Sequence, residues 1–305
     1  MRRLLLATLA LLWAGATPAE SAPEATNEPE SRLDADTFRG LALRGIGPAL
    51  MSGRIADIAI HPDDRSTWYV AVGSGGVWKT ENAGTTWDSI FDGQGSYSIG
   101  FIAIDPNDPD VIWVGTGEDV GGRHVGYGDG IYRSRDGGQS WTHMGLSESE
   151  HLSRILIDPR DSNVIYVAAE GPLWSAGGER GLYKTVDGGE TWTKILGGGP
   201  YTGANDVVMD PTDPDTLYAS THQRYRTVAA LINGGPESGI HKTTDGGKTW
   251  RELTRGLPDE DMGKIGLAIS HHDPQTIYAT IELAWREGGF YRSTDGGESW
   301  EKRND

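Results

Sequence analysis

One octapeptide pattern recurs along the chain and constrains the fold more than any other feature. Four copies combine Ser or Thr, Asp, a Gly pair and a final Trp, and they read SRDGGQSW, TVDGGETW, TTDGGKTW and STDGGESW. A weaker copy, TENAGTTW, precedes them. The final tryptophans lie 50 to 58 residues apart, at Trp87, Trp141, Trp192, Trp250 and Trp300. Such a period is typical of repeat architectures in which each repeat is one structural unit.

Each repeat has the pattern of four short β-strands. An apolar run such as Ile55–Ile60 or Ile155–Ile157 comes first and is expected to be buried on both faces. A Pro-containing turn, an aromatic strand, a strand of the GVWKT type and the octapeptide follow, and the fourth strand begins after the Trp. Four-stranded antiparallel sheets repeated radially form a propeller. The sequence therefore predicts an all-β fold, a β-propeller with five visible blades.

The octapeptide is predicted to be a structural turn and not a catalytic site. Its Asp can accept hydrogen bonds from backbone N–H groups, its glycines can adopt positive φ, and its Trp can fill the space between adjacent sheets. Identical acids repeated around a ring cannot converge on one substrate. We therefore assign structural roles to Asn82, Trp87, Asp136, Trp141, Asp187, Trp192, Asp245, Trp250, Asp295 and Trp300.

The pattern Ser/Thr-x-Asp-x-Gly-x-Ser/Thr-Trp resembles the Asp-box of the bacterial neuraminidase repeat, found in sialidases, xyloglucanase-type glycosidases and the sortilin ectodomain. The stretch from Ile46 to Thr80 also resembles secreted bacterial proteins described as glycosyl hydrolases or sortilin-like repeat proteins. The resemblance covers residues 54–305 and implies the fold more specifically than any activity. The first copy departs from it with Asn82 in the Asp position, so we expect a looser turn there.

The N-terminal residues are expected to lie outside the propeller. Residues 1–22 combine Arg2 and Arg3 with a short apolar stretch and small residues, which indicates a cleaved signal peptide and a secreted or periplasmic protein. Residues 23–37 have the composition of an acidic flexible linker. The propeller is assigned to residues 38–305, with a candidate closing strand at 38–48 and blades at 54–92, 98–146, 151–196, 203–257 and 263–305.

Closure of the ring stays open at this stage. Five units fit either a five-bladed ring or part of a larger one, and the resemblance implies six, seven or more blades, so we favour a fragment of a longer repeat protein. An unclosed ring would expose the apolar face of a terminal blade and an unpaired strand edge, through which copies can associate.

Charge and composition exclude several classes of function. The formal net charge of −17 disfavours nucleic acid and anionic membrane surfaces as partners. Cysteine is absent, and no phosphate loop or zinc motif occurs, so we expect no cofactor and no metal. The acids of DPNDPD and DPTDPD are better explained by turn capping than by calcium binding. The apolar run after Arg3 is too short to span a bilayer and is expected to be removed, so we expect no transmembrane segment in the mature chain.

Residues that depart from the repeat are the candidates for function. The longest departure, Gly115–Gly130, supplies the candidate acids Glu118 and Asp119. It also supplies the candidate ligand-binding residues Arg123, His124, Tyr127 and Asp129. Counting along the repeat places Arg54 and His151 at the central channel, where they can bind an anionic group. Three further loops carry aromatic residues able to stack on sugar rings, Trp174, Tyr201 and Tyr225.

Two functions fit these residues. The first is an exported module that binds a glycan or a peptide, or serves as a scaffold. The alternative is a xyloglucanase- or sialidase-like glycoside hydrolase that uses Glu118 and Asp119, because such hydrolysis needs one protonated and one ionised carboxyl group. The sialidase signature is missing from the chain. Resemblance to xyloglucanase-type enzymes implies a catalytic Asp where this chain has Gly73, so that role is vacant.

Overall fold

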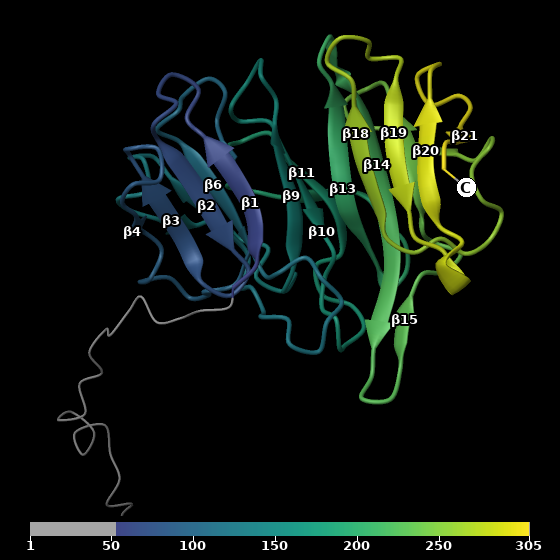
Figure 1. Cartoon of the computed structure of the whole chain (residues 1–305), viewed down its shortest axis with the longest axis horizontal. Helices are drawn as coiled ribbons and strands as arrows, with labels where there is room; N and C mark the ends of the chain where they lie inside the picture. The colour runs from purple at the N-terminus through teal and green to yellow at the C-terminus, as the bar shows by residue number, and fades with distance from the viewer. Residues whose placement is uncertain (1–52, 305) are drawn as a thin grey trace, which may run out of the picture. The chain divides into compact units, whose positions relative to one another are not determined.

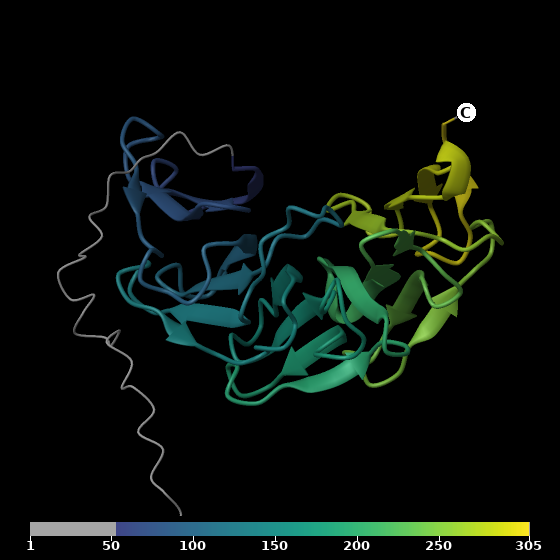
Figure 2. The same ribbon diagram turned by 90° about the horizontal axis from the view of Figure 1, so that it is seen from below.

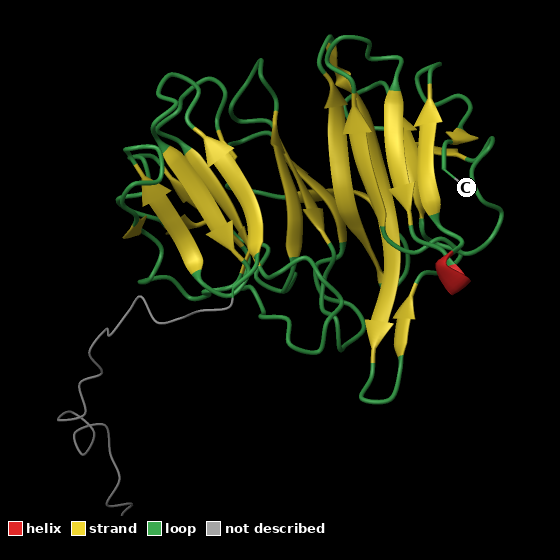
Figure 3. Ribbon diagram, viewed as in Figure 1, coloured by secondary structure: helices red, strands yellow, loops and turns green. Residues whose placement is uncertain are grey.

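The computed structural model describes residues 53–304, which form five antiparallel sheets and one short 3₁₀ helix, η1 (Ala284–Arg286) (Figures 1 and 3). The fold is an all-β propeller whose blades are these sheets. The predicted signal peptide, linker and closing strand at 38–48 lie outside the described residues. Within residues 53–304 no helix is long and apolar enough to cross a membrane.

Each sheet contains four strands in chain order. The first strands are β1 (Ile55–Ile60), β5 (Ile99–Ile104), β9 (Leu152–Ile157), β13 (Thr202–Asp210) and β18 (Ile265–Ile269). The second strands are β2 (Trp68–Val72), β6 (Ile112–Thr116), β10 (Ile165–Ala169), β14 (Asp213–Arg226) and β19 (Ile277–Ile281). The third strands are β3 (Gly76–Thr80), β7 (Ile131–Ser134), β11 (Gly181–Thr185), β16 (Gly239–Thr243) and β20 (Gly289–Ser293).

The fourth strands are short because each one begins after an octapeptide turn. They are β4 (Asp88–Ser89), β8 (Thr142–His143), β12 (Thr193–Leu196), β17 (Arg251–Leu253) and β21 (Glu301–Lys302). In the fourth sheet β14 is extended and forms a hairpin with the additional strand β15 (Leu231–Asn233). This hairpin projects beyond the other strands on one face of the propeller (Figure 1).

Successive sheets pack face to face through their first strands and their apolar faces. β1 contacts β5, β5 contacts β9, β9 contacts β13 and β13 contacts β18, so the first strands are the innermost ones (Figure 2). Buried clusters fill the spaces between neighbouring sheets. One of them joins Trp113, Ile131 and Met144 of the second sheet to Ile155 and Val167 of the third. Burial of such apolar surface is the main favourable term in folding.

The octapeptides form one repeated turn. In the second sheet Asp136 Oδ1 accepts a hydrogen bond from Ser140 N at 2.8 Å, and Ser134 Oγ accepts one from Gly138 N at 2.8 Å. Gly137 and Gly138 have φ of 66° and 90°, values that favour glycine. In the first copy Asn82 Oδ1 accepts the equivalent bond from Thr86 N at 2.8 Å. The expected loosening of this turn is therefore not observed.

The tryptophan of each later turn lies between its own sheet and the preceding one. Trp141 Nε1 donates to Ile90 O at 2.8 Å, and Trp192 Nε1 donates to Met144 O at 2.7 Å. Trp300 is only 6% exposed. Trp87 differs, because its Nε1 donates to Gly84 in its own turn and its side chain is 37% exposed.

The prediction that Ile55–Ile60 is buried on both faces is wrong. Ile55, Ile58 and Ile60 are 59%, 52% and 55% exposed. The equivalent strand of the third sheet behaves differently, since Ile155 and Ile157 are buried against the second sheet. Burial of a first strand thus depends on a preceding sheet, and none precedes the first sheet within residues 53–304.

Candidate functional site

A polar pocket of about 370 Å³ opens between the first strands of all five sheets. We call it the axial pocket. Its charged residues come from four sheets and from the loop after β6, and they are Arg54, Asp57, Glu118, Asp119, Arg154, Asp206 and Lys264. A site that gathers side chains from every sheet depends on the whole array, which is the usual position of ligand sites in radial folds.

The loop Gly117–Gly130, here called the crossing loop, contributes Glu118, Asp119 and Val120 to this pocket and is held by its own sheet and by the fourth sheet. Gly117 N donates to Ser98 O at 2.7 Å, and Arg123 donates to Val228 O at 2.7 Å in the fourth sheet. Arg226 in turn donates to Gly121 O at 2.9 Å. The segment that the sequence marks as a glycine-rich insertion is therefore fixed at both ends and in its middle.

Glu118 is buried, and its negative charge is balanced by Arg54. It is 3% exposed, and both of its carboxylate oxygens accept hydrogen bonds from the Arg54 guanidinium. A Cβ added at Gly73 would lie 2.6 Å from Glu118 Oε1, so the side chain of Glu118 fills the space beside Gly73. Gly73 occupies the position at which the family resemblance implies a catalytic Asp. It therefore lies against the Glu118 carboxylate, which comes from the second sheet.

Asp119 belongs to a buried charge cluster that the sequence does not reveal. Its carboxylate pairs with Lys264, whose Nζ also lies 3.4 Å from Glu170 Oε1. Glu170 is fully buried and pairs with the equally buried Arg224. His222 Nδ1 lies 3.7 Å from Glu170 Oε1. The charges therefore alternate from the crossing loop inward, in the order Asp119, Lys264, Glu170 and Arg224.

The cluster moves the pKa values of its two acids apart. Burial raises the pKa of Asp119 well above its ordinary value, and the negative charge of Glu170 adds to this effect. Burial alone would also raise the pKa of Glu170, but Arg224 and Lys264 outweigh it and hold that pKa well below the usual range. Glu170 is thus the permanent anion, and Asp119 is the acid that can be protonated.

The remaining acids of the pocket connect neighbouring first strands. Asp206 Oδ2 accepts a hydrogen bond from Leu267 N in the fifth sheet at 2.8 Å, and its carboxylate lies 3.1 Å from Arg154. Asp57 Oδ2 accepts one from Ile102 N in the second sheet at 3.4 Å. Burial raises the pKa of both acids. These bonds between sheets indicate a structural role for Asp57 and Asp206.

His151 is fully buried below the crossing loop, and its Nδ1 lies 2.9 Å from Glu118 O. Burial, with a contribution from Arg224, lowers the pKa of His151 to about 3. At neutral pH it is therefore uncharged. It supports the backbone of the crossing loop and does not offer a cation to an anionic ligand, which differs from the expectation for this residue.

The low pKa of His151 predicts a loss of stability in acid. Below about pH 6.5 the unfolded chain binds a proton that the folded chain does not, so the free energy of unfolding falls as pH drops, by up to ~1.4 kcal/mol per pH unit. Burial lowers the pKa of His241 to about 4, which contributes with the same sign. We expect His151→Gln to reduce this slope in urea titrations at about pH 7 and about pH 5. The exposed His272→Gln should leave the slope unchanged.

The aromatic candidates lie outside the lining of the axial pocket, and Tyr225 lies near the end of β14 and not in a loop. The rings of Tyr201 and Tyr225 contact each other with centroids 4.9 Å apart, and Arg226 lies 6.0 Å from the Trp174 ring. These three aromatic side chains are half-buried. Tyr127 is 53% exposed and lies 5.9 Å from His151. The crossing loop reaches this group through Arg226.

The other predicted residues divide into two groups. Arg54, Glu118 and Asp119 meet in the axial pocket. Asp129 instead accepts a hydrogen bond from Tyr132 Oη at 2.6 Å inside the second sheet, and His124 is exposed on the crossing loop.

Sequence reasoning missed several charged residues of the site, Arg154, Glu170, Arg224 and Lys264. Two of them left a signal in the repeat. Lys264 directly follows Gly263, which occupies in the fifth repeat the position that Arg54 has in the first. Glu170 directly follows the second strand of its repeat, where the first repeat has Gly73 and the second has Gly117.

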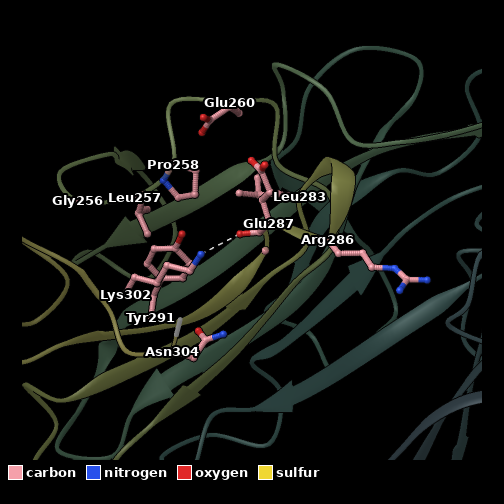
Figure 4. Close-up of a pocket in the computed structure, with 11 residues that line it drawn as sticks. Gly256, Leu257, Pro258, Glu260, Leu283, Arg286, Glu287, Tyr291, Lys302 and Asn304 are labelled. Carbon is pink, nitrogen blue, oxygen red and sulfur yellow. Dashed lines mark hydrogen bonds between the residues drawn. The ribbon is translucent and has the colours of Figure 1, made fainter.

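A second pocket, of about 580 Å³, lies beside β20 and β21 (Figure 4). Its lining includes Glu260, Tyr291 and Lys302, and Lys302 Nζ donates to Glu287 O at 2.9 Å. All of its residues come from the fifth sheet and the loop before it. It contains none of the candidate site residues, so the axial pocket is the better candidate. Within residues 53–304 no group of three His, Cys, Asp or Glu residues is placed to hold a metal ion.

Comparison with known proteins identifies the repeat. A family model described as BNR/Asp-box repeat matches residues 291–302, and one described as Sortilin, neurotensin receptor 3 matches residues 129–259. The chain therefore carries the Asp-box repeat. The geometry of the three other Asp-containing turns agrees with this assignment, because each has the same Asp and Ser or Thr hydrogen bonds as the matched copy.

Relatives of this Asp-box protein include glycoside hydrolases. It is 25% identical over 228 residues to a xyloglucanase of Hypocrea jecorina, which covers 65% of this chain and 26% of the relative. It is 26% identical over 234 residues to a probable oligoxyloglucan-reducing end-specific xyloglucanase of Neosartorya fischeri, covering 71% and 25%. The Asp-box protein thus spans about a quarter of the length of these relatives.

Solved structures show the same fold. The GH74 xyloglucanase from Xanthomonas campestris matches with a TM-score of 0.60 at 20% identity, covering 82% of this chain and 38% of that one. The GH74 enzyme of Niastella koreensis matches with a TM-score of 0.61 at 20% identity, covering 81% and 38%. At this identity the likeness establishes the propeller fold of the Asp-box protein. Its activity has to be inferred from the residues of the site.

Proposed function

We propose that this protein is an exported module that binds a polysaccharide at the axial pocket and at the aromatic residues held beside the crossing loop. The observation that supports this most is the pocket itself, which joins charged side chains from several sheets and whose crossing loop is hydrogen-bonded to Arg226, next to Tyr225 and Trp174. Arg54, Lys264 and Arg154 supply hydrogen-bond donors, and Asp119 supplies acceptors, as sugar hydroxyl groups require. The proposal of export rests on the signal peptide expected at residues 1–22.

Binding fits this geometry better than catalysis. Glycoside hydrolysis needs one protonated acid and one free carboxylate on either side of the scissile bond. Glu118 is buried in its ion pair with Arg54, and Glu170 is buried in its pair with Arg224. Asp57 and Asp206 are occupied in bonds between sheets. The acids of the pocket are therefore engaged in holding the fold.

The ligand class follows from the relatives. Their names state that they act on xyloglucan or its oligosaccharides, and a β-glucan chain offers hydroxyl groups for a polar pocket and apolar ring faces for aromatic side chains. A peptide ligand is the alternative for the same surface. We favour the polysaccharide because Trp174, Tyr201 and Tyr225 combine apolar rings with polar edges.

Hydrolysis is the second candidate function, and one observation favours it. Burial and the charge of Glu170 hold the pKa of Asp119 well above its ordinary value, and its side chain is 27% exposed, so it is the acid of this cluster that takes up a proton more readily and it can reach a ligand. A general acid needs both properties. In that case Asp119 would donate a proton to the leaving oxygen of a glucan.

Calorimetric titration with xyloglucan oligosaccharides tests the proposal. We expect saturable binding, and we expect Tyr225→Ala to weaken it about tenfold, which corresponds to roughly 1.4 kcal/mol of lost ring contact. Trp285→Ala is the matched control, because Trp285 is 92% exposed in η1 and lies outside both the axial pocket and the Tyr201–Tyr225 pair.

The same oligosaccharides distinguish the two functions. Binding without release of reducing sugar supports the module. Release that Asp119→Asn abolishes supports the hydrolase and replaces the first proposal. If the oligosaccharides fail to bind while a peptide library yields ligands sensitive to Tyr225→Ala, the polysaccharide assignment is wrong.

A further inference from the structure

The outer face of the first sheet is an apolar surface that no other sheet covers within residues 53–304. It contains a hollow of about 380 Å³ lined by Ile55, Ile58, Trp68, Val70, Val72, Trp78 and Trp87. The lining is entirely apolar. A contiguous exposed surface of this kind marks an interaction site in a soluble protein.

Strand register shows that the outer face of the first sheet is equivalent to the face of the third sheet that packs against the second. Ile58 pairs with Val70 and Val70 with Trp78, as Ile155 pairs with Val167 and Val167 with Tyr183 in the third sheet. In the third sheet these positions are packed against the second sheet. The first sheet therefore presents the face that in the third sheet receives its predecessor. We call it the receiving face.

The surface that packs against a receiving face has a recurring set of hydrogen-bond donors. At each of the four interfaces an aromatic residue of the second strand or a cation of the third strand donates to the carbonyl of the first octapeptide glycine in the next sheet. The bonds are Tyr69 to Gly137 at 3.3 Å, Arg133 to Gly188 at 2.6 Å, Tyr166 and Lys184 to Gly246 at 3.2 and 2.7 Å, and Tyr218 and Lys242 to Gly296 at 2.9 and 2.7 Å.

The fifth sheet carries the same donating groups without using them. Tyr278 pairs with Arg292 across β19 and β20 as Tyr218 pairs with Lys242 across β14 and β16. Among residues 53–304 neither Tyr278 nor Arg292 makes a side-chain hydrogen bond. Tyr278 is half-buried and stacks on Phe290, which is 38% exposed, whereas Tyr218 is 1% exposed. We call this surface the donating face.

We propose that the donating face of one copy packs against the receiving face of a second copy, head to tail. In this contact Tyr278 and Arg292 would donate to the carbonyl of Ala83, which occupies the position of the first octapeptide glycine and has φ of 54°. Phe290 would cover Ile58 and Trp78. The two faces differ, so the contact is heterologous and each added copy leaves one face of each kind available.

A second copy suits this face better than a single added strand. A strand such as the one expected at 38–48 would hydrogen-bond to a sheet edge and would leave the face of β1, β2 and β3 exposed. A complete sheet covers the face and also supplies the tyrosine and the cation. The chain carries both complementary halves, so no partner of other chemistry is required.

Sedimentation velocity on the full chain tests this proposal. We expect the wild-type protein to form oligomers whose size rises with protein concentration. Ile58→Glu disables the receiving face, and Arg292→Glu disables the donating face, so each variant alone should sediment as a monomer. Their equimolar mixture should form one-to-one dimers, because each variant retains the face that the other lacks.

Val186→Glu provides the matched control, because Val186 is 66% exposed on an octapeptide turn of the third sheet. This variant should associate like the wild type. Circular dichroism verifies that all variants fold, and Ile58 and Arg292 lie at the surface, so their replacement should leave the sheets intact. A monomeric wild type at every concentration would overturn the proposal, and so would a mixture that stays monomeric. Continued association of Ile58→Glu alone would do the same. The outcome is independent of sugar binding at the axial pocket.

Discussion

Replacing Arg224 with methionine is expected to lower the free energy of unfolding by about 3–5 kcal/mol. The change leaves Glu170, which is fully buried, without its closest cation. A buried charge that loses its partner costs far more than a surface charge, because water cannot solvate it. Lys264 lies 3.4 Å from Glu170 and offsets only part of the loss.

Urea unfolding measures this effect. Arg160→Met is the matched control, because Arg160 also pairs with two acids but its side chain is 49% exposed, and such surface pairs contribute about 0–1 kcal/mol. The double variant Glu170→Gln/Arg224→Met should regain part of the stability, because it removes the uncompensated charge. Equal losses in the Arg224 and Arg160 variants would show that burial of the cluster has no energetic consequence.

The second large effect concerns the tryptophans of the repeat. Trp300→Ala is expected to lower the free energy of unfolding by about 3–5 kcal/mol, because this side chain is 6% exposed and fills the space between the fourth and fifth sheets. Trp87→Ala should cost about 1 kcal/mol or less in a monomer, since Trp87 is 37% exposed with no preceding sheet against it.

Thermal unfolding of the two variants side by side provides the comparison. Both tryptophans occupy the same position in the same octapeptide, so local turn geometry is matched and only the neighbouring sheet differs. If the two variants lost the same stability, the tryptophan would act inside its own turn and not between sheets. A large loss for Trp87→Ala that grows with protein concentration would instead indicate that a second copy covers it.

The fold could be predicted from the repeat because each octapeptide turn is formed by residues that are close in the sequence. The Asp, Gly and Trp of each octapeptide determine one turn, and the hydrogen bonds of Asp136 and Ser134 follow from residues within seven positions. Burial of β1 was not predictable in the same way, because it depends on a neighbouring sheet. The apolar runs Ile55–Ile60 and Ile155–Ile157, which belong to equivalent strands, therefore have opposite exposure.

The candidate site could be predicted only in part, because its contacts join residues far apart in the chain. Glu118 and Asp119 were identified by their departure from the repeat. Their partners Arg54 and Lys264 lie 64 and 145 positions away, and nothing in the sequence announces those pairings. The departure of the crossing loop from the repeat also does not reveal its contacts with Val228 and Lys264, which hold it in place.

The recurrent bond from one sheet to the glycine carbonyl of the next couples each blade directionally to its successor, and the contacts of the crossing loop with the fourth and fifth sheets add to this coupling. Linear arrays with such coupling unfold from their ends, because a terminal unit has one interface to lose and an internal unit has two. Amide hydrogen exchange should then be slowest in β9 and β10 and should quicken toward β1 and β20. The axial pocket, to which all five sheets contribute, would lose its outermost walls first, so that ligand occupancy and fraying at the two ends of the array oppose each other.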